Sequence, residues 1–166
     1  MTTTSAVSPY TVHPGEGEAA WYLGSLFEWK ARGADTGGEL AAVETTVQPG
    51  GEPPLHVHER EDEVFLVLNG KITFQLGDER VDAEPGAWVF APRGVPHGFA
   101  VRTDVARMLN VMTPAGLEPL FDRFSEPAGE RTLPPLPAGP PDMEAMTAAM
   151  TEHGVTIVGP PLPVLL

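Results

Sequence analysis

The chain contains no cysteine, and only five of its 166 residues are histidine. Without cysteine there is no disulfide bond, thiolate zinc site, iron–sulfur cluster or cysteine nucleophile, so any metal ligands must be His, Asp or Glu. No apolar run approaches the roughly 18 residues of a membrane span. Residues 1–20 also lack the basic and apolar regions of a secretory signal peptide, which predicts a cytoplasmic protein.

Basic residues are scarce as well, since ten Lys and Arg stand against 23 Asp and Glu and give a net charge of −13. This charge repels phosphate backbones and anionic lipid headgroups, so we expect neither nucleic acid nor a membrane as a partner. Glycine (18 residues) and proline (19 residues) are plentiful and favour many short elements over long helices. The composition therefore predicts one all-β domain, with room for an appended segment.

The pattern of residues divides the chain into three regions. Residues 1–20 are small, polar and turn-rich, and we expect a flexible arm or an edge strand there. Residues 21–112 contain nine short strand-like runs, which is typical of a β-sandwich or barrel. Within them, the dipeptides Asn69-Gly70 and Gly77-Asp78 predict tight hairpin turns.

Residues 113–166 predict a helical, proline-rich extension packed on the barrel. Apolar residues at helical spacing predict two short helices, the first with Leu117, Leu120, Phe121 and Phe124 and the second with Met143, Met146, Ala149 and Met150. Asp142 is a suitable N-cap for the second helix, and Gly154 a suitable stop. The tail from residue 155 is apolar enough that we expect it to lie on the barrel.

Two compact clusters hold three of the five histidines, and their spacings are Gly50-x5-His56-x-His58-x4-Glu63-x6-Gly70 and Gly86-x5-Pro92-x-Gly94-x2-His97. Residues i and i+2 of a strand project from one face about 6.6 Å apart, at ~3.3 Å per residue, so His56 and His58 can converge on one ion. Glu63 has the opposite parity, so residues 59–62 must form a turn or bulge.

The second cluster can supply a third imidazole from a different strand, because Pro92 and Gly94 make a turn before His97. Three imidazoles and one carboxylate suit one divalent transition metal (Fe, Mn, Ni, Co, Cu or Zn) and leave positions for substrate, water or dioxygen. A hard ion such as Ca²⁺ would need more oxygen ligands. Trp21, Phe65 and Phe99 are candidates for an apolar wall of a substrate pocket, with ordinary core packing as the alternative.

The two clusters resemble the two sequence motifs of the cupin superfamily in their order and spacing. The resemblance implies a small antiparallel cupin barrel, a double-stranded β-helix or jelly roll, with a central metal whose ligands are His56, His58, Glu63 and His97. Glu61 is an alternative acidic ligand, and the six-residue spacing to Gly70 favours Glu63. Val101 stands where many cupins have asparagine.

A finer resemblance is to the single-domain bacterial quercetinase-like cupins, carried by Trp21–Gly24, Asp35–Gly38, residues 53–70, Thr113–Glu118 and Val158–Pro161. It implies a homodimeric quercetin 2,3-dioxygenase-like oxidoreductase that cleaves a flavonol-like or other enolic or phenolic small molecule with O2. Glu63 would be both metal ligand and catalytic proton acceptor. A metal-dependent isomerase, lyase or cyclase, or a non-catalytic small-molecule-binding cupin, are the alternatives on the same barrel.

Overall fold

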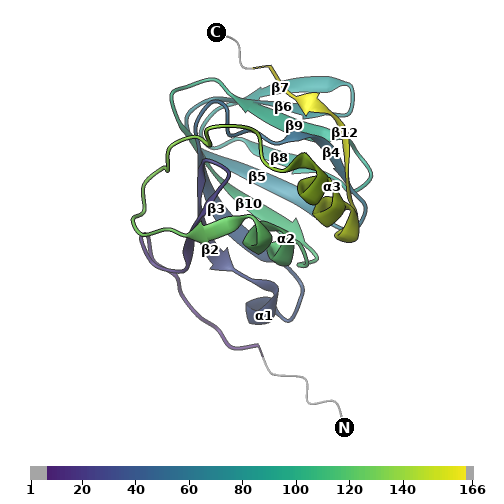
Figure 1. The fold of residues 1–166 in the computed structure, drawn as a ribbon. Helices are drawn as coiled ribbons and strands as arrows, with labels where there is room; N and C mark the ends of the chain where they lie inside the picture. Colours follow the sequence, from purple (N-terminus) through teal and green to yellow (C-terminus); the bar gives the residue numbers. More distant parts are fainter. Residues whose placement is uncertain (1–6, 164–166) are drawn as a thin grey trace.

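The computed structural model describes residues 7–163, and two antiparallel β-sheets form their body (Figure 1). The larger sheet has the order β11 (Ser125–Pro127), β1 (Ala19–Tyr22), β2 (Ser25–Ala31), β3 (Ala41–Val47), β10 (Ala106–Thr113), β5 (Asp62–Asn69) and β8 (Trp88–Ala91). The smaller sheet has the order β12 (Val155–Pro161), β4 (Pro54–His58), β9 (His97–Val101), β6 (Ile72–Leu76) and β7 (Glu79–Ala83). The prediction of an all-β antiparallel body is confirmed.

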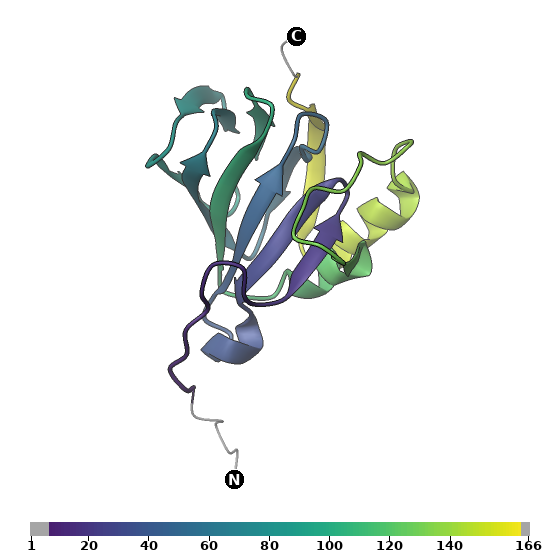
Figure 2. The ribbon, with the colours of Figure 1, turned by 90° about the vertical axis from the view of Figure 1, so that its left-hand side faces the viewer.

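Residues 7–163 also contain three short helices, α1 (Gly33–Thr36), α2 (Glu118–Arg123) and α3 (Met143–Glu152). Helices α2 and α3 lie together on one side of the molecule, and the teal strands β6 and β7 lie on the other (Figure 2). In the described part of the chain, no helix has the length and apolar character needed to cross a membrane.

One of the two predicted hairpins is confirmed and the other is wrong. Gly77 and Asp78 join β6 to β7, whose residues Leu76 and Glu79 face each other across the turn. Asn69-Gly70, by contrast, joins β5 in the larger sheet to β6 in the smaller one. Gly70 has a φ of +80°, and a Cβ there would lie 2.6 Å from the Val105 carbonyl oxygen, so the sheet-to-sheet crossing requires glycine.

The first predicted run, residues 21–31, is divided into two strands. Leu23 and Gly24 both have positive φ, +48° and +87°, and they form the turn between β1 and β2. Of the predicted N-terminal arm, residues 1–6 lie outside the described residues, residues 7–18 contain no strand, and β1 begins at Ala19.

The C-terminal extension contains both predicted helices. It also adds one strand to each sheet, β11 to the larger and β12 to the smaller. Asp142 caps α3 by accepting hydrogen bonds from the backbone N–H groups of Glu144 and Ala145, at 3.1 and 3.0 Å. Residues 155–161 of the tail form β12, which pairs with β4 and thereby lies directly beside the first histidine motif, and residues 164–166 lie outside the described residues. An edge position suits this strand, because Pro160 and Pro161 have no N–H to donate to a second neighbour.

Two apolar clusters fill the space between and beside the sheets. One, centred on Phe65, Phe74 and Phe99, packs the sheets together at the end where β6 and β7 lie. The other joins β2 and β3 to the two C-terminal helices. Of the predicted methionine stripe on α3, Met146 and Met150 belong to this second cluster, whereas Met143 is 46% exposed.

Candidate metal centre

The first two histidines lie on β4, a strand of the smaller sheet. His56 and His58 are two residues apart, so both project from the same face, and they are 8% and 3% exposed. β4 lies between β12 and β9, and the residue opposite His56 on β9 is His97. The strand pairing therefore brings the two sequence motifs side by side.

The turn after β4 carries the chain into the larger sheet and reverses the parity, as the spacing predicts. β5 begins at Asp62, and Glu63 points inward and is 4% exposed. Asp62 holds this turn against the second motif, since both of its carboxylate oxygens accept hydrogen bonds from the Arg93 guanidinium, each at 3.0 Å. The Gly94 N–H also donates to the carbonyl oxygen of His58 at 2.8 Å.

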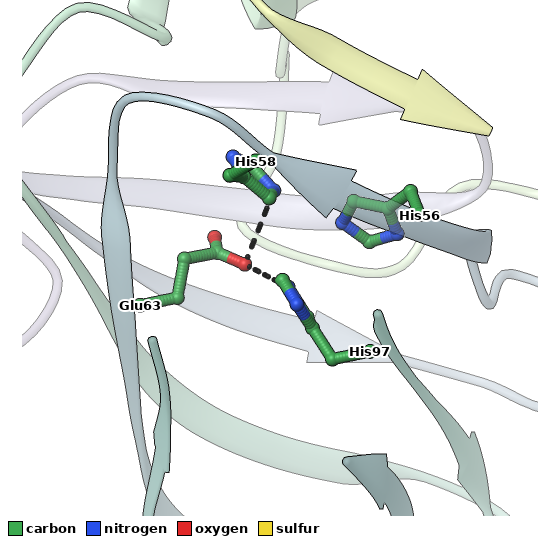
Figure 3. Close-up of side chains that lie close together, drawn as sticks. All are labelled: His56, His58, Glu63 and His97. Atoms are coloured by element: carbon green, nitrogen blue, oxygen red, sulfur yellow. Dashed lines mark hydrogen bonds and ion pairs between the residues drawn. The ribbon is translucent and has the colours of Figure 1, made fainter. Parts of the chain in front are cut away.

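The side chains of His56, His58, Glu63 and His97 converge from three strands of two sheets (Figure 3). Each offers one ligand atom, and these four atoms lie within 4.8 Å of one another. Oε2 of Glu63 is 2.7 Å from Nε2 of His97 and 3.4 Å from Nε2 of His58. All four residues are buried, so the cluster is an interior group of donors rather than a patch of surface charge.

In each of the three imidazoles, Nδ1 points away from the centre of the cluster and contacts an oxygen atom. Nδ1 of His56 donates to the Pro54 carbonyl at 2.7 Å, and Nδ1 of His97 to the Val95 carbonyl at 3.1 Å. Nδ1 of His58 faces Oε2 of Glu61 at 3.4 Å. Carbonyl and carboxylate oxygens only accept, so these contacts place a proton on Nδ1 of each ring, and an imidazole without a second proton then offers Nε2 as the inward ligand atom.

The donor atoms fit a metal ion. Nε2 of His58 is buried and has no hydrogen-bond partner among the described residues, which is unusual for a native structure. Three inward nitrogens and one carboxylate oxygen form a donor set typical of divalent transition metals. Residues His56, His58, Glu63 and His97 could therefore hold one such ion.

The two acidic candidates occupy different places. Glu63 belongs to the inner group of four, whereas Glu61 lies on the far side of His58 and contacts its outer nitrogen. Both carboxylates are buried, at 4% and 3% exposure. Glu61 is therefore placed to orient the imidazole of His58, and Glu63 is placed among the candidate ligands.

The cluster shifts the proton affinities of its members. Burial raises the pKa of Glu63, but the facing imidazoles of His58, His97 and His56 outweigh it and hold that pKa well below its usual range. Burial lowers the pKa of His58, but Glu63 and Glu61 more than compensate and raise it. Burial, with His97 close by, lowers the pKa of His56 to about 4.

The lowered pKa of His56 predicts a loss of stability in mild acid. The unfolded chain takes up a proton on this residue as the pH falls through about 6.5, whereas the folded chain takes it up only near pH 4. The contribution of neutral His56 is thus present above pH 6.5 and is lost toward pH 4, by about 3 kcal/mol.

Urea unfolding of the metal-free protein at pH 7 and pH 4.5 measures this contribution. The wild type should lose more of its free energy of unfolding between the two values than the His56→Gln variant does. Equal losses in the two proteins would contradict the assignment.

A cavity of about 550 Å³ opens beside the cluster. The four residues of the cluster line one part of it, and the rest is mainly apolar, with Phe27, Leu120, Phe121, Leu136, Met146 and Met150. Residues 136–137 and 139–141 of the proline-rich segment, which lies between α2 and α3 in the sequence, also border the cavity. The site can therefore enclose an organic molecule in contact with the four candidate metal ligands.

Phe65 and Phe99 both line this cavity, and Trp21 does not. Alternate residues of β1 face opposite sides, so Trp21 points away and donates its indole N–H to the Thr132 carbonyl at 2.9 Å, whereas Tyr22 reaches the cavity. Burial raises the pKa of Tyr22 to about 12, so this phenol is neutral at physiological pH.

Asn110 is a cavity residue that the sequence analysis missed. It lies on β10 between the buried Met108 and Met112, and its Nδ2 donates to Oε1 of Glu63 at 3.2 Å. A single amide inside an alternating apolar strand was the available signal, since inward positions of such a strand are normally apolar.

Fold and site together define a small antiparallel barrel with an interior group that could bind a metal. Residues 43–112 match the family described as a cupin domain. Solved structures that resemble the chain include KdgF from Halomonas sp. (TM-score 0.58, 20% identity, 67% of this chain and 97% of that one) and an RmlC-like cupin from Shewanella frigidimarina (TM-score 0.58, 21% identity, 67% and 96%). Residues 43–112 thus match a cupin domain, and the fold is that of a cupin barrel.

Two curated proteins are related in sequence. Quercetin 2,3-dioxygenase of Bacillus subtilis is 28% identical over 127 residues, which cover 76% of this chain and 38% of that protein. An uncharacterized protein of Aquifex aeolicus is 30% identical over 60 residues, 36% of this chain and 50% of that protein. The chain thus spans half or less of the length of each of these relatives.

Proposed function

We propose that this cupin is a metal-dependent dioxygenase that cleaves a flavonol-like or other enolic or phenolic small molecule. The observation that carries the proposal is the group of three imidazoles and one carboxylate that opens on a largely apolar cavity of about 550 Å³. Similarity to a quercetin 2,3-dioxygenase supports this substrate class. Such a molecule has a ring body for the apolar walls and a hydroxyl group for the metal site.

The residues of the cluster and of the cavity have different roles in the proposed reaction. A divalent ion held by the four residues would supply Lewis acidity, which lowers the pKa of a hydroxyl bound to it. Glu63 accepts the hydroxyl proton at Oε2, the oxygen that faces the imidazoles. Phe65 and Phe99 pack against the ring of the substrate, and the apolar walls exclude water from the reacting atoms.

Oxygen uptake tests the proposal. The protein is supplied with quercetin and related enols, either with its copurified metal or after loading with Fe, Mn, Co, Ni or Cu. Consumption of O2 that depends on the metal and the substrate supports a dioxygenase. Absence of uptake with every metal overturns it, and turnover under anaerobic conditions would identify an isomerase, lyase or cyclase instead.

The predicted homodimer and the cytoplasmic location both stay predictions. For the dimer, the exposed edge of the larger sheet is a suitable surface, because Trp88 and Phe90 on the edge strand β8 are 66% and 51% exposed. Light scattering gives the molar mass in solution, and a value near that of one 17.7 kDa chain would contradict pairing.

A further inference from the structure

Asn110 has a position where an apolar side chain would pack well. It faces the interior from the middle of β10, with Val43 opposite it on β3 and Phe65 opposite it on β5. The inward residues on either side of it along the strand are Met108 and Met112, which are 1% and 0% exposed. An amide at this place needs a reason other than core packing.

The contacts of Asn110 leave part of its amide unused. Nδ2 donates one hydrogen to Oε1 of Glu63, and because a carboxylate only accepts, this bond determines which way the amide faces. Oδ1 is consequently buried, without a hydrogen-bond partner among the residues described. A buried acceptor without a partner costs about 1–3 kcal/mol, so stability of the fold does not explain the residue.

The second hydrogen of Nδ2 is the unused donor. Asn110 and Glu63 both line the cavity, and Asn110 is half-buried although its Oδ1 is fully covered. The Asn110 side chain therefore lines the cavity next to Glu63, beside the four candidate metal ligands. A donor at this place can reach an oxygen atom of a molecule whose hydroxyl group points at the four residues.

We propose that Asn110 is a positioning and specificity-determining residue that holds Glu63 with one amide hydrogen and donates the other to an acceptor oxygen of the substrate. This inference rests on the proposed function and narrows its substrate class. The substrate carries a carbonyl or enolate oxygen close to the hydroxyl that approaches the cluster. A fixed donor next to such an oxygen favours the form of the substrate that carries negative charge.

Binding of quercetin under anaerobic conditions tests this role without relying on turnover. The dissociation constant and the absorption maximum of bound quercetin are measured for the wild type, Asn110→Leu and Asn110→Asp at equal metal content. Asn69→Leu is the matched control, because it makes the same substitution at the only other asparagine, which is exposed at the end of β5.

Asn110→Leu should weaken quercetin binding about 2- to 10-fold, as expected for one lost hydrogen bond, and should shift the absorption maximum of the bound ligand. Asn110→Asp keeps the shape but replaces the donor with an acceptor beside Glu63, so it should bind no better than Asn110→Leu. Asn69→Leu should match the wild type. Near-UV circular dichroism verifies that each variant is folded.

The outcomes separate this inference from the proposed function. If both Asn110 variants bind quercetin as tightly as the wild type and the absorption maximum is unchanged, the role of Asn110 is overturned. The dioxygenase proposal is then unaffected. If Asn110→Leu does not fold, Asn110→Asp alone decides, and binding equal to the wild type overturns the inference. Failure of the wild type to bind quercetin overturns both proposals.

Discussion

The His97→Ala variant is expected to lose its metal and, with it, all metal-dependent oxygen uptake. His97 is the one imidazole that comes from β9, and its Nε2 lies 2.7 Å from Oε2 of Glu63. Loss of an outer-shell partner alone typically costs 10–100-fold in metal affinity, and loss of a ligand should cost at least roughly that much. The remaining imidazoles of β4 lie on one side of the site and cannot replace a donor from the neighbouring strand.

Elemental analysis of the purified variant measures the effect. His13→Ala is the matched control, because His13 is exposed in the N-terminal segment and lies outside the cluster. The control should retain the metal content of the wild type, and a His56→Ala variant should behave like His97→Ala. Full metal occupancy in His97→Ala, with a normal circular dichroism spectrum, would show that the ligand assignment is wrong.

The composition of the site could be predicted from the sequence because strand geometry determines it locally. The i, i+2 relation of His56 and His58 and the parity change before Glu63 depend only on the two-residue period of a strand. The structure brings these residues together with His97, and the register of β4 against β9 explains why. That register was available only through the resemblance to the cupin motifs.

Features that depend on non-local pairing could not be predicted. An Asn-Gly dipeptide indicates a tight turn, but whether the next strand returns to the same sheet depends on distant residues, and Gly70 leads into the other sheet. Similarly, the apolar tail was expected to lie on the barrel, and only the pairing of Val155 with His58 identifies it as the strand beside the site.

A shift of one residue explains the error at Trp21. The face to which a strand residue points depends on where the strand begins and turns, and the turn at Leu23 and Gly24 was not recognised. The structure therefore places Tyr22 on the cavity and Trp21 outside it. Asn110 was missed for a different reason, because its importance comes from its contact with Glu63, 47 residues away in the sequence.

The second large effect is expected for Glu63→Gln, which should lower kcat about 10²–10⁴-fold, the range for loss of a positioned general base. Glutamine keeps the size of the side chain and an oxygen donor, but it has no charge and cannot accept the hydroxyl proton. The facing imidazoles hold the pKa of Glu63 well below its usual range, so the carboxylate is ionised throughout the neutral pH range. The loss should therefore be similar at every pH between about 6 and 8.

Glu61→Gln separates the two acidic residues in the same assay. Its amide oxygen can still accept the hydrogen bond from Nδ1 of His58, so this variant should keep most of its kcat at equal metal content. Oxygen uptake at saturating substrate, normalised to the metal found by elemental analysis, gives kcat for both variants. A larger loss in Glu61→Gln than in Glu63→Gln would reverse the assignment, because it would place the proton acceptor on the outer side of His58 rather than inside the cluster.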